Sequence, residues 1–151
     1  MRRAVIGAVL SVGVIAVGAA PADGATRAEY ITQVDPICQS TNDAMSHAAK
    51  GLQQDKKARR FKVAARKLRA QLAIFGPAVE QIAALDPPVT DAPLIANWVQ
   101  MLRSQVPVVK HLAKDYAQGH LRTKAYFRLG SLITKTEALV ASFGFHSCQD
   151  L

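Results

Sequence analysis

Two cysteines are the residues of this chain best suited to covalent chemistry. Cys38 and Cys148 lie 110 positions apart, and neither belongs to a C-x-x-C pair. The motifs of thioredoxin-like redox chemistry and of c-type haem attachment are therefore missing. A catalytic thiolate needs a nearby base, and His146 is close to Cys148 only along the chain. The alternatives are a structural disulfide, free or intermolecular thiols, and a catalytic cysteine.

A run of cationic side chains could attract an anionic partner. Positions 56–69 hold eight Lys and Arg residues and no acid. The eight are Lys56, Lys57, Arg59, Arg60, Lys62, Arg66, Lys67 and Arg69. Anionic lipid, an anionic wall polymer and nucleic acid are the conceivable partners, and the alternative is a solvated face. Nucleic acid is the least expected, because Phe61, the one aromatic residue of the run, falls on the predicted core face.

Residues that could bind a metal or perform acid–base chemistry are scattered. The four histidines form no i,i+4 pair, and none of the three glutamates begins a Glu-x-x-His motif. The chain also contains no G-x-S-x-G, P-loop or G-x-G-x-x-G motif. We therefore expect no catalytic residue, no metal site, no cofactor and no enzymatic activity.

Composition places the chain among ordinary globular proteins. Its 151 residues are half apolar and one-fifth charged, which excludes a disordered chain, and the length suits one domain. The formal net charge is +8. Residues 23–151 carry +6, and positions 56–69 alone carry +8, so the rest of that part is slightly acidic. This distribution predicts that any charge-driven function depends on one helix.

The first residues have the three parts of a secretory signal peptide. Arg2 and Arg3 precede 17 uncharged residues, and Ala20-Pro21-Ala22 fits the cleavage pattern. We predict a signal peptide over 1–22 and one domain over 23–151, secreted or held in the cell envelope. An uncleaved membrane anchor is the alternative, although the apolar run is shorter than the roughly 20 residues of a spanning helix. Membrane attachment is expected only through that segment if it stays uncleaved.

Four amphipathic segments follow the signal helix. Apolar residues alternate three and four positions apart over 26–50, 56–85, 91–118 and 121–143. Thr26 and Glu29 form a capping box, Asp55 is a candidate cap for the second segment, and no segment alternates as a strand does. The short links predict an all-α, up-down-up-down four-helix bundle.

This architecture decides between the alternatives for the cysteines. Cys38 lies early in the first helix and Cys148 follows the fourth, and a four-helix up-down bundle brings these positions to one end. Export also exposes the thiols to an oxidising compartment. We therefore predict a Cys38–Cys148 disulfide.

Prolines inside the helices suggest a second kind of site. Pro77 and Pro107 each interrupt a predicted helix, and Pro36 predicts a restart or kink in the first. Such kinks either curve a helix around its core or open a pocket between helices. A pocket here could be lined by Trp98 and Tyr116, which otherwise read as core residues.

The order of several short motifs resembles a family of short exported helical proteins from actinobacteria that has no assigned activity. The matching segments are Asp35-Pro36-Ile37-Cys38, Leu85-Asp86-Pro87-Pro88, Trp98 with Leu102, and Phe143-Gly144-Phe145-His146-Ser147-Cys148. The resemblance implies a paired cysteine and a helical bundle and transfers no catalytic residue. Pro36 departs from the small residue usual at that position.

These observations favour a non-enzymatic binding or structural role in the cell envelope. The leading hypothesis is association of the basic start of the second helix with an anionic lipid or wall polymer. The alternative is a carrier of a small ligand or haem in a pocket between kinked helices.

Overall fold

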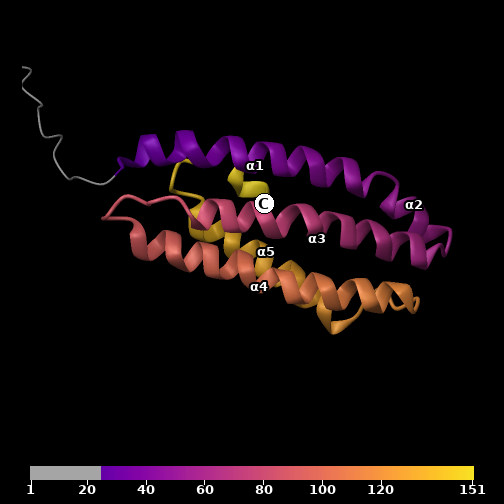
Figure 1. Cartoon of the computed structure of the whole chain (residues 1–151). Helices are drawn as coiled ribbons and strands as arrows, with labels where there is room; N and C mark the ends of the chain where they lie inside the picture. The colour runs from indigo at the N-terminus through magenta and orange to yellow at the C-terminus, as the bar shows by residue number, and fades with distance from the viewer. Residues whose placement is uncertain (1–24) are drawn as a thin grey trace, which may run out of the picture.

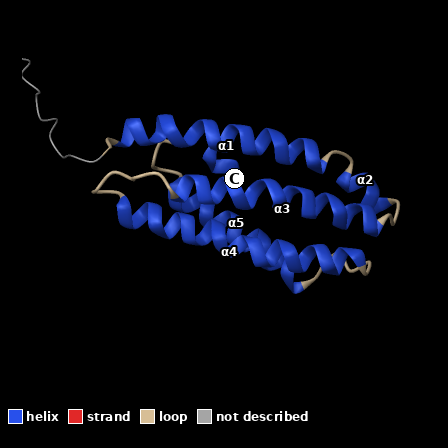
Figure 2. Ribbon diagram, viewed as in Figure 1, coloured by secondary structure: helices blue, strands red, loops and turns tan. Residues whose placement is uncertain are grey.

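Six helical elements make up the part of the chain that the computed structural model describes, residues 25–151. The predicted signal peptide lies outside these residues. The elements are α1 (Arg27–Ala49), α2 (Leu52–Lys57), α3 (Phe61–Ala83), α4 (Ala92–Ala117), α5 (Lys124–Val140) and the 3-10 helix η1 (Cys148–Asp150). Within the described range there is no strand, and the predicted all-α four-helix arrangement is confirmed (Figure 2).

The four long helices run alternately up and down (Figure 1). Helix α3 packs between α1 and α4, and α4 packs on α5. The C-terminal segment completes the remaining side, because η1 contacts both α1 and α5. Figure 1 shows the end of the chain tucked against the bundle beside α1 and α3. The fourth edge of the bundle is thus built largely by a non-helical return of the chain.

Two apolar clusters fill the bundle, one toward each end. The larger cluster surrounds the disulfide and includes the fully buried Tyr30, Val34, Trp98 and Leu102. The smaller cluster lies between α3, α4 and α5, where Ala64, Ala65, Leu68, Leu112 and Tyr116 are buried. Small alanine side chains on α3 let its neighbours approach closely, whereas the other end is filled by aromatic rings.

Helix α1 begins as predicted and continues further than the prolines suggested. The Thr26 hydroxyl accepts a hydrogen bond from the Glu29 N–H, and the Glu29 carboxylate accepts one from the Thr26 N–H. The helix runs unbroken through Pro36 to Ala49, so the predicted restart at Pro36 is not found. Helices α3 and α4 likewise continue through Pro77 and Pro107.

The predicted second helix is divided in two. Asp55 does not cap it but lies inside the short helix α2, which ends at Lys57. Arg59 then adopts a positive φ of 56°, and α3 begins at Phe61. The fourth long helix is shorter than predicted, because the Thr123 hydroxyl caps it by accepting a hydrogen bond from the Tyr126 N–H.

Candidate functional site

A disulfide fixes the C-terminal segment to α1. Cys38 and Cys148 are bonded, as the sequence predicted, and both are buried. The bond closes a loop of 110 residues, for which chain entropy predicts about 4–5 kcal/mol of stabilisation. A buried disulfide is typical of an oxidising, extracytoplasmic environment.

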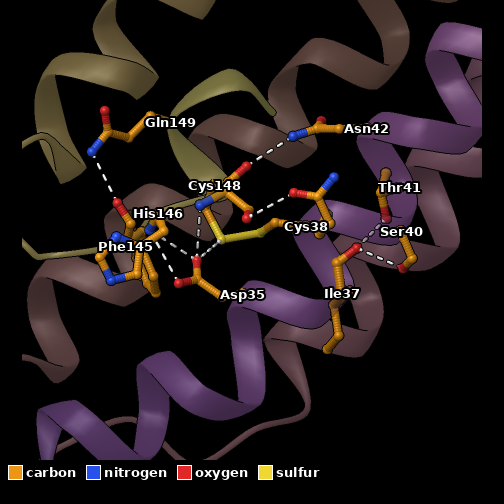
Figure 3. Close-up of a disulfide and its surroundings, with 12 residues drawn as sticks. Asp35, Ile37, Cys38, Ser40, Thr41, Asn42, Phe145, His146, Cys148 and Gln149 are labelled. Atoms are coloured by element: carbon orange, nitrogen blue, oxygen red, sulfur yellow. Dashed lines mark hydrogen bonds between the residues drawn. A yellow bond between two sulfur atoms is a disulfide. The ribbon is translucent and has the colours of Figure 1, made fainter.

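Hydrogen bonds around the disulfide hold the same segment (Figure 3). The Asp35 carboxylate accepts from the backbone N–H groups of His146 and Ser147, at 3.0 and 3.1 Å. The Asn42 amide donates to the Ser147 carbonyl oxygen at 2.8 Å. His146 thus meets α1 through its backbone in these bonds, so the disulfide region has the contacts of a structural clasp.

The eight predicted cationic residues are spread over α2, a turn and the first turns of α3. Lys56 and Lys67 are half-buried, and the other six are exposed: Lys57, Arg59, Arg60, Lys62, Arg66 and Arg69. The Lys56 ammonium lies 5.7 Å from the centre of the Tyr116 ring. The fold therefore brings the eight together at one end of the bundle, but not along one helix.

Asp55 binds two of these eight residues. Its carboxylate, 3% exposed, accepts hydrogen bonds from the Arg60 guanidinium at 2.8 Å and from the Lys67 ammonium. Lys67 also donates to the Lys50 carbonyl oxygen at the end of α1. The hydrogen bond from Lys67, followed by that from Arg60, lowers the pKa of Asp55. Arg60 and Lys67 thus fix the α2–α3 turn, and the other exposed cations face solvent.

The turn between α4 and α5 lies at the same end and adds further positive charge (Figure 1). It packs against the start of α3, since a Cβ at Gly119 would lie 3.1 Å from the Phe61 ring. Five cations flank this turn: Lys110, Lys114, Arg122, Lys124 and Arg128. The sequence analysis missed them, because they are dispersed along the chain; their signal was their position on both sides of a predicted helix break.

We call the segments 50–69 and 110–128 the basic end. They hold fourteen Lys and Arg residues against two Asp residues, a formal charge of +12. The rest of residues 25–151 holds three basic and eight acidic residues, a formal charge of −5. The bundle therefore has strong charge separation along its length, which corrects the expectation that one helix carries all the positive charge.

A cleft of about 300 Å³ lies between α4 and α5 within the basic end. Pro107, Val108 and Ala125 form its apolar part. His111, Lys124 and Arg128 supply its polar part, and the His111 Nε2 lies 3.6 Å from an Asp115 carboxylate oxygen. Two permanent cations beside an apolar floor suit a singly or doubly charged anion such as a phosphate group.

An apolar cavity of about 180 Å³ lies between the four long helices. Its lining draws on both core clusters: Met45, Leu68, Gln71, Leu72, Phe75, Gln105, Val109, Leu129, Ile133 and Leu151. The Gln105 amide donates to the Thr136 hydroxyl at 3.2 Å, which satisfies part of the buried polar surface nearby. The cavity does not lie where the sequence suggested, because Trp98 and Tyr116 are both buried elsewhere in the core.

Residues 25–151 contain no group of three or more His, Cys, Asp or Glu side chains placed to hold a metal ion. Over the same residues, no helix is long and apolar enough to cross a membrane. No protein-family model, curated protein or solved structure matches the chain. The resemblance to the actinobacterial family therefore stays a prediction that depends on the quoted motifs.

Proposed function

We propose that this chain is an exported, non-enzymatic protein of the cell envelope whose basic end binds an anionic surface. The observation that carries the proposal is the separation of +12 on the basic end from −5 on the rest of the described residues. Clustered cations add their attraction for a phosphate-bearing surface, at about 1 kcal/mol for each Lys or Arg near it. The acidic remainder is repelled by the same surface, so the bundle should bind end-on.

Location outside the cytosol is supported by two independent features. The buried Cys38–Cys148 disulfide suits an oxidising compartment. The predicted signal peptide over 1–22 supplies a route to such a compartment. In this setting the available polyanions are phospholipid head groups and phosphate-bearing polymers of the envelope, and nucleic acid is an unfavoured partner.

Adsorption experiments test the proposed function. Protein prepared by export is mixed with vesicles of phosphatidylglycerol and phosphatidylcholine, with vesicles of phosphatidylcholine alone, and with immobilised polyphosphate. We expect binding to the anionic targets only, and release at high salt because screening shortens the range of the attraction. Absence of binding to both anionic targets at low salt would refute the proposal.

A second candidate function is carriage of a small apolar ligand, favoured by the mid-bundle cavity. Its volume of about 180 Å³ exceeds the roughly 150 Å³ of an engineered apolar cavity that binds benzene. The lining offers one soft metal ligand, the Met45 thioether, so we propose an apolar ligand in preference to haem. Native mass spectrometry of protein from its own host should then detect a bound small molecule, and Leu72→Trp should displace it by filling the cavity. A wild-type mass equal to that of the bare chain would count against carriage.

A further inference from the structure

Two adjacent aromatic side chains are exposed in the basic end. The chain has nine aromatic residues, and all but Tyr126 and Phe127 are buried or half-buried. Tyr126 is 43% exposed and Phe127 is 55% exposed, in the first turns of α5. Their rings contact each other edge to face, with centres 5.3 Å apart. Together they form a compact apolar projection on an otherwise strongly cationic surface.

Cations surround this aromatic pair. The Arg122 guanidinium lies 5.7 Å from the centre of the Phe127 ring. Lys124 and Arg128, immediately before and after the pair, line the α4–α5 cleft together with His111. The exposed rings therefore lie directly beside a cationic pocket large enough for a phosphate group, with all these groups positioned by α4 and α5.

We infer that the anionic surface is a phospholipid membrane, and that Tyr126 and Phe127 insert between its head groups while Lys124 and Arg128 bind lipid phosphates. This inference depends on the proposed function, because the charge of the basic end brings the rings to the membrane. Aromatic rings are favoured at the membrane–water interface, where one side of the ring is apolar and its surroundings are polar.

A bilayer accounts for both features, whereas a polymer accounts for one. A soluble polyphosphate would contact the cations and gain little from an exposed Phe127 ring. A bilayer offers phosphate groups and, directly below them, an apolar layer that can bury the rings. Single-stranded nucleic acid also combines phosphates with stacking surfaces, but it would need both faces of a ring to be free along a groove. Here the edge of one ring covers the other.

Removing the rings should weaken lipid binding selectively. The double variant Tyr126→Ser and Phe127→Ser leaves every charge in place, and Val89→Ser removes another exposed apolar side chain, 75% exposed, at the opposite end. We expect the double variant to lower partitioning onto phosphatidylglycerol vesicles about tenfold, from the lost burial of the two half-exposed rings. Val89→Ser should bind as the wild type does. Affinities for polyphosphate and for oligothymidine should be unchanged in both variants.

A tryptophan at the insertion point reports depth directly. Trp98, the only tryptophan of the chain, is fully buried, so lipid chains carrying bromine should not quench it in the wild type. Phe127→Trp should bring a second emission that bromine in the acyl chains quenches when anionic vesicles are added. Val89→Trp, at the far end, should show no such quenching. Circular dichroism melting curves check that each variant retains the fold.

The outcomes separate this inference from the proposed function. If no anionic target binds the wild type, the proposed function fails and the inference fails with it. If vesicles and polyphosphate bind but the Ser variant and Phe127→Trp show no effect of lipid, the inference is overturned and the proposed function stands. If the Ser variant loses affinity for oligothymidine, the rings stack on bases and the membrane assignment is wrong.

Discussion

The Asp35 carboxylate accepts a hydrogen bond from the backbone N–H of His146, whose nitrogen lies 3.0 and 3.1 Å from its two oxygens. The two residues are 111 positions apart, and the Cys38–Cys148 disulfide lies beside them. Helix α1 therefore holds the returning C-terminal segment both covalently and through an ionised acceptor. The covalent bond restricts the unfolded chain, whereas the carboxylate acts on the folded one.

Asp35→Ala should destabilise the disulfide-bonded protein by about 2 kcal/mol, because it removes a charged acceptor from two backbone N–H groups. Denaturant unfolding of the oxidised protein measures this change. Asp43→Ala is the matched control, since Asp43 is exposed on the same helix and accepts only from the Gln39 side chain. Equal effects of the two variants would contradict a clasp at Asp35.

Asp55 should make the α2–α3 turn sensitive to acid. Hydrogen bonds from Lys67 and Arg60 lower its pKa in the folded protein below the ordinary 3.8. A lowered pKa contributes stability above pH 3.8, and that contribution is lost as the pH falls through the folded-state pKa. Asp55→Asn should therefore be less stable than wild type at pH 7, with the difference shrinking below pH 3.8. Hydrogen exchange of the α2 amides should accelerate in this variant; an unchanged exchange rate would argue against the role given to Asp55.

Tyr30 should make the protein sensitive to alkali. Burial raises the pKa of its hydroxyl to about 12, from an ordinary value of 10.0. The folded state keeps this proton while the unfolded chain releases it, so about 3 kcal/mol of stability should be lost between pH 10 and 12. The hydroxyl has no hydrogen-bond partner among the described residues. Tyr30→Phe should thus be at least as stable as wild type at pH 7 and should lose less stability in alkali, as measured by denaturant titrations. A wild-type alkaline loss retained in full by Tyr30→Phe would show that another group titrates.

Two glycines should respond to the same substitution with opposite signs. Gly119 has a φ of +84°, and a Cβ there would lie 3.1 Å from the Phe61 ring, so Gly119→Ala should cost about 1–2 kcal/mol. Gly130 lies inside α5 with open space around its Cα, so Gly130→Ala should stabilise by about 0.5–1 kcal/mol. Thermal unfolding of both variants tests the pair. A destabilised Gly130→Ala would mean that the exposed face of α5 is covered in solution.

Local signals in the sequence predicted most of the fold. The Thr26–Glu29 capping box marked the start of α1, and the turn before Ala92 marked the start of α4 within one residue. The disulfide followed from the helix order, because four antiparallel helices place Cys38 and Cys148 at one end. These features depend on neighbouring residues or on topology, both of which the sequence carries directly.

The errors arose where a distant residue determines the local structure. Asp55 resembled a helix cap, but its carboxylate binds Lys67, twelve residues later, and so lies inside a separate helix. The C-terminal segment resembled a tail, but it packs between α1 and α5. Trp98 resembled a pocket residue, but it stacks on Phe145 with ring centres 5.1 Å apart. No periodic pattern in the sequence encodes such contacts.

Both turns of the basic end should contribute to binding anionic vesicles. One variant removes three exposed cations near the start of α3, through Lys57→Gln, Lys62→Gln and Arg66→Gln. A second removes three exposed cations beside the α4–α5 turn, through Lys110→Gln, Lys114→Gln and Lys124→Gln. Each variant should weaken binding at low salt about a hundredfold, from about 1 kcal/mol for each cation near the surface.

A third variant separates local charge from net charge. Asp43→Asn, Asp86→Asn and Glu137→Gln together raise the net charge by three outside the basic end. Binding through the basic end predicts little change in its vesicle affinity, because these sites face away from the surface and are screened beyond about 10 Å. If only the α3 variant loses affinity, the positive charge acts through one helix, as the sequence alone suggested. If the third variant binds more tightly by the same factor that the others lose, net charge rather than its placement controls the interaction.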